Sequence, residues 1–563
     1  MAAVLGDDRR PMTAARADGW WELDEPVNAG TDYAFSIDDG PPLPDPRSAW
    51  QPHGVHGPSR VVDFGAFPWS DQLWRGVPLP GAVIYELHVG TFTDEGTFDA
   101  AIGKLDHLVD LGVGAVELLP VNAFPGEHGW GYDGVGLYAV QHSYGGPDGL
   151  KRFVDACHAR GVGVVMDVVY NHLGPAGNYL SQFGPYFTDT HTTPWGPAVN
   201  LDAAGSNEVR AFVLDNVRMW LRDYHIDGLR LDAVHALQDD RATHLLEEMS
   251  AEVAALAAHV GRPLFLIAES DLNDPRLVTS REAGGYGLDA QWADDIHHAL
   301  HSALTGERQG YYVDFGSLST LAKVLTSVFV HDGSWSTFRG RDHGRPVDRE
   351  RTPGWRFLAY LQDHDQVGNR AQGDRISASL SPGLLKIGAA LVLTGPFTPM
   401  LWMGEEWGAS TPWQFFTDHD PDLGALVREG RRAEFTSHGW GPEEVPDPQD
   451  PETFRRSKLN WAEAAEGAHT ELLTWYRDLC RLRRVWPELT DGRLDRVEVD
   501  YNEQQRWLVM RRNGISVLCN LSTEERLLPL SGPAQLLLAS GTCRLDDVAA
   551  VVAPETVAIV AGA

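Results

Sequence analysis

The sequence predicts an α/β protein made of eight successive βα units, with a small β-domain before them and a second one after them. From about Ala82 to Glu488, apolar strand-like runs alternate with helical patterns, which is typical of repeated βα units. On either side, short runs of alternating apolar and polar residues are separated by turn residues. The chain has 563 residues, which is long enough for one large domain with two satellites.

The first part, residues 1–65, is predicted to be a small β-sandwich-like domain. Short alternating runs occur at Trp20 to Leu23 (W-W-E-L) and at Tyr33 to Ile37 (Y-A-F-S-I). The turn signals D-D-G-P-P and P-D-P follow them. The last part, residues 489–563, has short β runs such as W-L-V-M-R-R and I-S-V-L-C-N-L, and predicts a C-terminal β-sandwich.

The large middle part, residues 66–488, contains eight candidate strands. They are Val83 to Val89, Ala115 to Leu119, Gly163 to Val169, Gly228 to Asp232, Leu264 to Glu269, Ala290 to Trp292, Phe357 to Leu361 and Met400 to Met403. The Gly- and Pro-rich stretch from Gly174 to Asn200 is too long for a simple βα loop, so we expect an excursion that covers the functional site.

The charge of the chain limits its partners. It has 46 basic and 79 acidic residues and a formal net charge of −33, which argues against nucleic acid or an anionic membrane surface. A neutral sugar polymer is compatible with this charge, and solubility alone also explains it.

Cysteine usage and the absence of membrane signals favour a soluble cytoplasmic protein. Cys157, Cys480, Cys519 and Cys543 are scattered without metal-ligand spacing, and the first ten residues do not resemble a signal peptide. No apolar stretch is long and uncharged enough to span a bilayer.

The most informative segment is D-G-L-R-L-D-A-V, from Asp227 to Val234. Residues i and i+2 of a strand point to the same face, so Arg230 and Asp232 would project together. A buried ion pair with a purely structural role is the alternative explanation. Two further acids, Glu269 and Asp365, also end apolar strand-like runs, and three acids at strand ends suggest glycoside chemistry.

That chemistry needs two carboxyl groups in different protonation states. Arg230 favours the ionised form of Asp232, whereas Glu269 ends a hydrophobic strand and suits the proton donor. Asp365, preceded by His364, could hydrogen-bond the hydroxyls of the reacting sugar. A further acid, Asp363, would share the face of Asp365 in a regular strand and would then raise the pKa of its neighbours.

Four segments in order resemble the motifs of the alpha-amylase superfamily: D-V-V-Y-N-H at Asp167, D-G-L-R-L-D-A-V-H at Asp227, A-E at Ala268, and H-D at His364. The resemblance implies a (β/α)8 TIM barrel and a retaining double displacement. Asp232 would be the nucleophile, Glu269 the acid/base and Asp365 the transition-state stabiliser. The implied substrate-binding residues are Tyr132, Asp133, His172, Arg230, His235, His364, Gln366, Trp413 and Phe415.

Longer strings are most similar to the maltooligosyltrehalose trehalohydrolase family. The most discriminating are H-D-Q-V-G-N-R from His364, M-G-E-E-W-G-A-S-T-P from Met403 and F-F-T-D-H from Phe415. The resemblance implies cleavage of the α-1,4 bond next to a terminal trehalose, with maltooligosaccharides as the related ligands and a maltooligosyltrehalose synthase as functional partner. It also implies an immunoglobulin-like N-terminal domain, which is shorter here than in the family.

Two other functions stay open from the sequence. A glycogen branching or debranching enzyme would share part of these strings, and new α-1,6 branches would identify a branching enzyme. A non-catalytic glucan-binding protein is the other alternative, although all three acids are retained. No cofactor is expected, and no metal either, because Asp167, Asn171 and His172 cannot supply the roughly six to eight oxygens that calcium requires. Asp167 is expected to brace Arg230 or the barrel mouth.

Aromatic side chains should supply the faces on which sugar rings pack. The resemblance places Tyr132 against the reacting ring, with Asp133 nearby. Weaker candidates, for which ordinary packing is an equal explanation, are Trp335, Phe338, Arg339, Trp413, Phe415 and Phe416.

Overall fold

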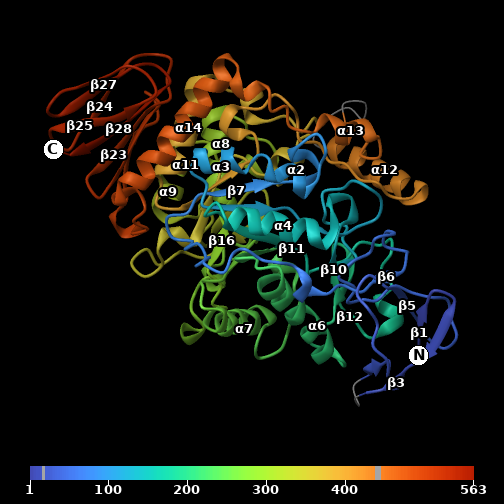
Figure 1. Ribbon diagram of the computed structural model, residues 1–563. Helices are drawn as coiled ribbons and strands as arrows, with labels where there is room; N and C mark the ends of the chain where they lie inside the picture. The colour runs from blue at the N-terminus through green and yellow to red at the C-terminus, as the bar shows by residue number, and fades with distance from the viewer. Residues whose placement is uncertain (16–18, 438–444, 563) are drawn as a thin grey trace.

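Eight parallel strands close into a barrel at the centre of the computed structural model, which describes residues 1–15, 19–437 and 445–562 (Figure 1). In chain order the strands are β7 (Ile84–Leu87), β8 (Ala115–Leu118), β11 (Gly163–Val168), β14 (Gly228–Leu231), β15 (Phe265–Ala268), β16 (Ala290–Trp292), β19 (Phe357–Ala359) and β20 (Thr398–Trp402). Neighbours pair in this order, and β20 pairs with β7 to close the ring. The eight predicted strands and the barrel are confirmed.

Alternate residues of these strands point into the barrel and divide its interior into two layers. The lower layer is apolar and includes Ile84, Val165, Ile267, Leu358 and Met400, which pack in one buried cluster. The next inward positions, nearer the carboxyl ends of the strands, carry charge. They are Glu86, Glu117, Asp167 and Arg230, all buried.

A glycine makes room for this packing at the start of β14. A Cβ atom on Gly228 would lie 2.3 Å from the ring of Phe265 on the neighbouring strand, so a larger residue would push β14 away from β15. The spacing of Arg230 and Asp232 from the Glu269 strand therefore depends on Gly228.

Helices cover the outside of the barrel (Figure 1). They are α2 (Phe98–Ile102), α3 (Leu105–Leu111), α4 (Gly146–His158), α6 (Ser206–Arg218), α7 (Leu245–Val260), α8 (Asp294–Thr305), α9 (Leu318–Ser327), α11 (Pro382–Thr394) and α14 (Gly467–Val485). In α7, Leu245, Met249 and Val253 recur at helical spacing and are buried. The chain between β15 and β16 is described throughout and forms only two 3-10 turns, Pro275–Leu277 and Arg281–Ala283.

The two ends of the chain form β-structure on opposite sides of the barrel (Figure 1). At the N-terminal end, β1 (Ala2–Leu5), β2 (Asp8–Pro11), β5 (Asp32–Ser36) and β6 (Ser59–Arg60) make a sheet in the order β2-β1-β5-β6. Between β2 and β5 in the chain, β3 (Thr13–Ala14) and β4 (Trp21–Glu22) pair with each other as a short antiparallel hairpin.

Two antiparallel sheets follow α14 and enclose a buried core of their own. The first has the order β21-β22-β23-β28-β25 and the second β24-β27-β26. Their strands are β21 (Glu498–Asn502), β22 (Trp507–Arg512), β23 (Ile515–Asn520), β24 (Arg526–Pro529), β25 (Ala534–Ala539), β26 (Cys543–Leu545), β27 (Ala549–Val552) and β28 (Thr556–Gly562). Val509 and Leu518 of one sheet pack with Leu528 and Val552 of the other, as a sandwich requires.

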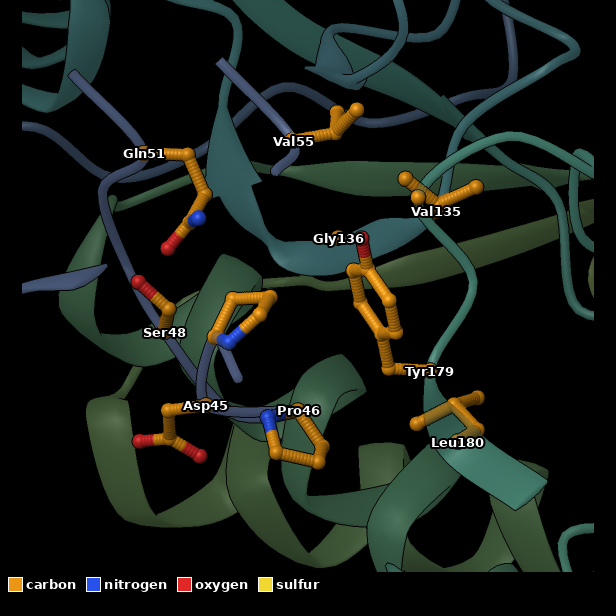
Figure 2. A pocket seen from close by; sticks show the side chains of 11 residues that line it. Asp45, Pro46, Ser48, Gln51, Val55, Val135, Gly136, Tyr179 and Leu180 are labelled. Carbon is orange, nitrogen blue, oxygen red and sulfur yellow. The ribbon is translucent and has the colours of Figure 1, made fainter. Parts of the chain in front are cut away.

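The predicted excursion after β11 contains α5 (Leu180–Phe183) and a hairpin of β12 (Phe187–Thr193) and β13 (Gly196–Val199). A small pocket of about 30 Å³ lies where this excursion meets the N-terminal segment, between Pro46, Val55, Val135 and Tyr179 (Figure 2). None of the predicted site residues lines it. Gly177, at φ +85, touches Val55 so closely that a Cβ would lie 2.5 Å from it.

Within the described ranges, no helix combines the length and the apolar character needed to cross a membrane.

Candidate active site

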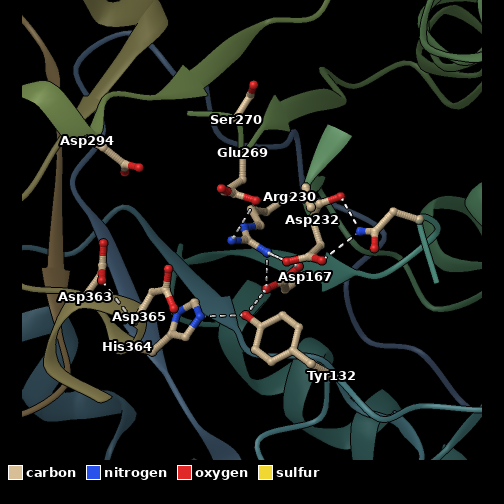
Figure 3. Close-up of polar contacts among 12 residues, drawn as sticks. Tyr132, Asp167, Arg230, Asp232, Glu269, Ser270, Asp294, Asp363, His364 and Asp365 are labelled. Carbon is tan, nitrogen blue, oxygen red and sulfur yellow. Dashed lines mark hydrogen bonds and ion pairs between the residues drawn. The ribbon is translucent and has the colours of Figure 1, made fainter. Parts of the chain in front are cut away.

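The three predicted catalytic acids lie together at the carboxyl ends of the barrel strands (Figure 3). Asp232 follows β14 directly, Glu269 follows β15 directly, and Asp365 lies in the short helix α10 (His364–Gly368) after β19. Parallel strands of a closed barrel end on one rim, which is why segments so distant in sequence meet there.

Asp232 is held from both sides. Arg230 Nη1 contacts its Oδ1 at 2.7 Å, and Asn171 Nδ2 donates to its Oδ2 at 2.8 Å. Both partners favour the negatively charged carboxylate. Asn171 also donates to the backbone oxygen of Asp232 at 2.8 Å, which fixes the turn after β14.

Arg230 is the buried cation at the centre of the site. Its Nη1 also contacts Asp167 Oδ2 at 2.8 Å, which confirms that Asp167 braces this arginine. Its Nη2 lies 3.7 Å from Glu269 Oε2, and its guanidinium carbon lies 4.5 Å from the centre of the Trp292 ring. One guanidinium thus touches carboxylates from three strands or strand ends.

Glu269 is prepared to carry a proton. Burial raises its pKa well above the ordinary range, Arg230 opposes this, and the charges of Asp232 and Asp294 add to the rise. The backbone N–H of Ala233 donates to Glu269 Oε2 at 2.6 Å. Ala233 has the left-handed value φ +39, a conformation uncommon for residues other than glycine, and this turn carries its N–H to Glu269.

His364 connects the first barrel strand to the sugar-facing side. Its Nδ1 lies 2.5 Å from Glu86 Oε1, and its Nε2 lies 2.9 Å from the hydroxyl of Tyr132. Tyr132 in turn donates to Asp167 Oδ2 at 2.6 Å. Burial lowers the pKa of His364 to about 4 and raises the pKa of Glu86 to about 8.

Asp363 caps the helix that carries Asp365. Its Oδ1 accepts the backbone N–H groups of Asp365 and Gln366, both at 2.9 Å. β19 ends at Ala359, so the regular strand that would place Asp363 on the face of Asp365 does not continue this far. Burial, together with Glu86 and Asp365, raises the pKa of Asp363 well above its usual range. Asn369 Nδ2 donates to Asp365 Oδ1 at 2.6 Å.

The remaining residues predicted to touch the reacting sugar line one side of the site. Tyr132 stacks on His364 and stays partly exposed. His172 Nε2 lies 3.0 Å from the backbone oxygen of Tyr132, and Asp133 Oδ2 lies 3.5 Å from His419. Trp195, at the turn of the β12–β13 hairpin, stacks on His172 with ring centres 4.4 Å apart and remains half exposed.

The aromatic candidates separate by burial. Trp413 and Phe416 are fully buried, and the Trp413 indole N–H donates to the backbone oxygen of His364 at 2.9 Å. Trp413 therefore holds the backbone of His364 in place, and its buried ring is not exposed to contact a sugar. Phe415 is partly exposed and packs on Trp130.

Other predicted positions lie at the rim. Trp335 and Phe338 are exposed on a hairpin of β17 (Ser334–Ser336) and β18 (Arg341–His343), and Arg339 pairs with Asp271 at 2.9 Å. His235 is exposed in the turn after β14. Gln366 is buried against Asp363, where it supports the cap of α10.

Sequence reasoning missed Glu86, Asp294 and Trp195 as parts of the site. Glu86 lies in the string I-Y-E-L-H-V, whose inward alternation could have identified it. Asp294 follows the candidate strand Ala290 to Trp292 and could have been found by the rule that located the other acids. Trp195 sits in a turn whose position over the site only the folded excursion reveals.

One group of possible metal ligands occurs within the residues that the structure describes: His191, Asp202 and Asp240, whose ligand atoms lie within 4.8 Å of one another. His191 already pairs with Asp202 at 2.9 Å, and Asp240 is almost fully exposed. The ion pair between His191 of the excursion and Asp202 accounts for the closeness of these groups.

Comparisons with known proteins agree with this architecture. The model of the alpha-amylase catalytic domain matches residues 70–188, and the model of a domain of unknown function, DUF3459, matches residues 492–560. A crystal structure of a putative alpha amylase from Salmonella typhimurium superposes with a TM-score of 0.90 at 38% identity, covering 100% of this chain and 95% of that one.

Similarity to curated proteins extends over almost the whole chain. The malto-oligosyltrehalose trehalohydrolase of Rhizobium sp. (strain M-11) is 55% identical over 554 residues, which are 98% of this chain and 93% of that protein. The protein of the same name from Mycobacterium tuberculosis (strain ATCC 25618 / H37Rv) is 56% identical over 529 residues, covering 93% of this chain and 90% of that one.

Proposed function

Because the chain belongs to the malto-oligosyltrehalose trehalohydrolase family of alpha-amylase-like enzymes, we propose that it hydrolyses the α-1,4 bond next to the terminal trehalose of maltooligosyltrehalose. The products are trehalose and a shorter maltooligosaccharide. One observation carries the proposal. Asp232 is held by Arg230 and Asn171 in a way that favours its charged form, whereas burial raises the pKa of the adjacent Glu269.

The first step uses these two carboxyl groups in opposite protonation states. A carboxylate oxygen of Asp232 attacks the anomeric carbon and forms a glycosyl ester. The bond from that carbon to the glycosidic oxygen breaks, its electron pair stays on the oxygen, and Glu269 transfers a proton there. Trehalose leaves as the neutral alcohol.

The second step reverses the role of Glu269. The Glu269 carboxylate removes a proton from water, the resulting hydroxide oxygen attacks the anomeric carbon, and the ester bond to Asp232 breaks. The maltooligosaccharide leaves with its α configuration retained, and both carboxyl groups return to their starting states.

Neighbouring groups position the reacting sugar. Asp365 Oδ1 accepts from Asn369, and its Oδ2 is placed to accept from a sugar hydroxyl, whereas His364 orients Tyr132. Arg230 stabilises charge on Asp232 throughout. Tyr132 and His172, with Trp195 behind it, offer ring faces on the same side. Hydrogen bonds of this kind strengthen as the ring flattens toward the oxocarbenium-like transition state.

An Asp232→Asn variant tests the proposal. The amide keeps the volume and the contact with Asn171 but is a poor nucleophile, so trehalose release from maltotriosyltrehalose should be lost while the far-ultraviolet circular dichroism stays unchanged. Asp240→Asn, an exposed acid on a nearby loop, is the matched control and should keep full activity. Near-normal turnover by Asp232→Asn would contradict the assignment.

Two finer features belong to the same proposal. The substrate carries an α,α-1,1 linkage at its end, so an enzyme that creates this linkage, a maltooligosyltrehalose synthase, has to supply it. Cells that lack both enzymes should make trehalose from maltooligosaccharides only when both are restored. A cytoplasmic location is supported by four free cysteines, three of them buried, and cell fractionation tests it.

A further inference from the structure

Asp294 is a carboxyl group on the catalytic rim that the mechanism above leaves without a role. It begins α8 two residues after β16 ends, and β16 lies between β15 and β19 in the barrel. Asp294 therefore occupies the arc of the rim between Glu269 and Asp365. Figure 3 shows its carboxyl group directed toward the space that these two acids border.

Within the described part of the chain, only one of its two carboxylate oxygens has a partner. Tyr360, just beyond β19, donates its hydroxyl to Asp294 Oδ1 at 2.5 Å. Among the residues that the structure describes, no hydrogen bond reaches Oδ2. The hydrogen bond from Tyr360 holds the Asp294 side chain in place and leaves Oδ2 available to a ligand.

The neighbouring Asp295 shows what a structural acid looks like at this junction. Its Oδ2 accepts the backbone N–H groups of Val330 and His331 at 2.7 and 3.0 Å and the amide of Asn273 at 3.0 Å. Asp295 thus fixes the start of α8, and that task does not fall to Asp294.

The surroundings of Asp294 are acidic. Burial, with Asp365, Asp271 and Asp295 nearby, raises its pKa to about 7, and no ion pair to it exists among the described residues. A partly buried carboxyl group with an unused oxygen is stabilised when a donor satisfies it, and a sugar hydroxyl is such a donor.

The position of Asp294 indicates which sugar it meets. The residues that hold the reacting ring, Tyr132 and His172, come from the loops after β8 and β11, across the barrel from β16. Glu269 must face the glycosidic oxygen, so the leaving sugar lies beyond that oxygen. On that side, Arg339 of the β17–β18 loop pairs with Asp271, which follows Glu269 by two residues.

We propose that Asp294 accepts a hydrogen bond from a hydroxyl of the departing trehalose and is a specificity-determining residue of the leaving-group side. This inference rests on the proposed function and extends it by naming a residue that binds the leaving sugar. Tyr360 is the positioning residue that orients Asp294.

Two substrates that share the reacting sugar but differ in the leaving group test the proposal. Maltotriosyltrehalose leaves trehalose, whereas α-maltotriosyl fluoride leaves fluoride and places no sugar beyond Glu269. Asp294→Asn keeps an oxygen for Tyr360 and replaces the free acceptor by an amide. Its kcat/KM for maltotriosyltrehalose should fall about 10- to 100-fold, the range for a lost hydrogen bond to a charged group, with the fluoride unaffected.

Two further variants separate contact from packing. Tyr360→Phe should produce a smaller loss with the same substrate selectivity. Asp295→Asn should lower the unfolding midpoint and change both substrates equally. Equal losses on both substrates for Asp294→Asn, or no loss on either, would overturn the inference. Wild-type enzyme that hydrolyses the fluoride but releases no trehalose would instead overturn the proposed function.

Discussion

His364 shows how single side chains set the protonation of this site. The one hydroxyl proton of Tyr132 is donated to Asp167, so Nε2 of His364 must carry a proton and donate it to the Tyr132 oxygen. Nδ1 then shares a single proton with Glu86. Because burial disfavours both charges, with the pKa of His364 at about 4 and that of Glu86 at about 8, the neutral pair holds at pH 7 and Glu86 donates.

Substitution of Glu86 tests this proton assignment. Glu86→Gln keeps a donor for Nδ1 and an acceptor for the backbone N–H of His364, so kcat should stay within several-fold of wild type. Glu86→Leu removes both and should lower kcat by at least about tenfold, since a buried nitrogen is left unpaired. Steady-state kinetics on both variants measure this. Equal losses for Gln and Leu would mean that a charged Glu86 is required.

The raised pKa of Glu269 has a direct consequence for the pH dependence of catalysis. The acid must be protonated in the first step, so kcat/KM should fall on the alkaline side only above the ordinary glutamate range. Glu269→Gln should lower kcat/KM by about 10²- to 10⁴-fold and remove this alkaline limb. The kcat/KM for α-maltotriosyl fluoride, which reports the first step and needs no proton for its leaving group, should suffer much less. Parallel losses on both substrates would exclude Glu269 as the proton donor.

At the scale of elements, the sequence predicts the barrel strands well because each is buried on both faces and appears as an apolar run between turn signals. The acids at the strand ends follow from the same pattern. The sequence pattern does not show which aromatic side chains are buried. Trp413 and Phe415 are two residues apart, yet Trp413 is fully buried and Phe415 is partly exposed. Only the path of the loop after β20 decides that difference. The domain boundaries near residues 65 and 488 stay predictions.

A network at the opposite end of the barrel joins α4 to the start of β14. His158 contacts Asp227 at 2.9 Å and Asp71 at 2.8 Å, and all three side chains are buried. Burial lowers the pKa of His158, but the hydrogen bonds to Asp227 and Asp71 outweigh it, so the net pKa is raised. Charged His158 therefore contributes stability that is complete below its unfolded pKa of about 6.5 and is lost as the pH rises through the folded value.

His158→Gln should reduce the free energy of unfolding by about 3 kcal/mol at pH 6, because it leaves two buried acids with one partner fewer. The difference from wild type should shrink at alkaline pH. Guanidinium unfolding at several pH values measures it, with the exposed His259→Gln on α7 as control. A difference that grows with pH would contradict a charged His158.

At the scale of the whole molecule, both the chain as a whole and its candidate active site are rich in acidic residues. The net charge of −33 is compatible with a neutral glucan, and in the site the buried carboxyl groups greatly outnumber the central Arg230. Burial favours the protonated forms of Glu86 and Glu269, whose pKa values it raises. The sequence predicts the three acids but not this charge balance, which depends on side chains from several strands meeting inside the barrel and at its rim.

Release of trehalose from maltotriosyltrehalose, followed by sugar chromatography and by proton NMR in the first minutes of reaction, tests the central proposal most directly. Equal amounts of trehalose and maltotriose are expected, and the new maltotriose end should first appear in the α form because two displacements occur at one carbon. A first product in the β form would contradict the double displacement through Asp232. Absence of trehalose, or new α-1,6 branches in amylose, would contradict the proposed reaction.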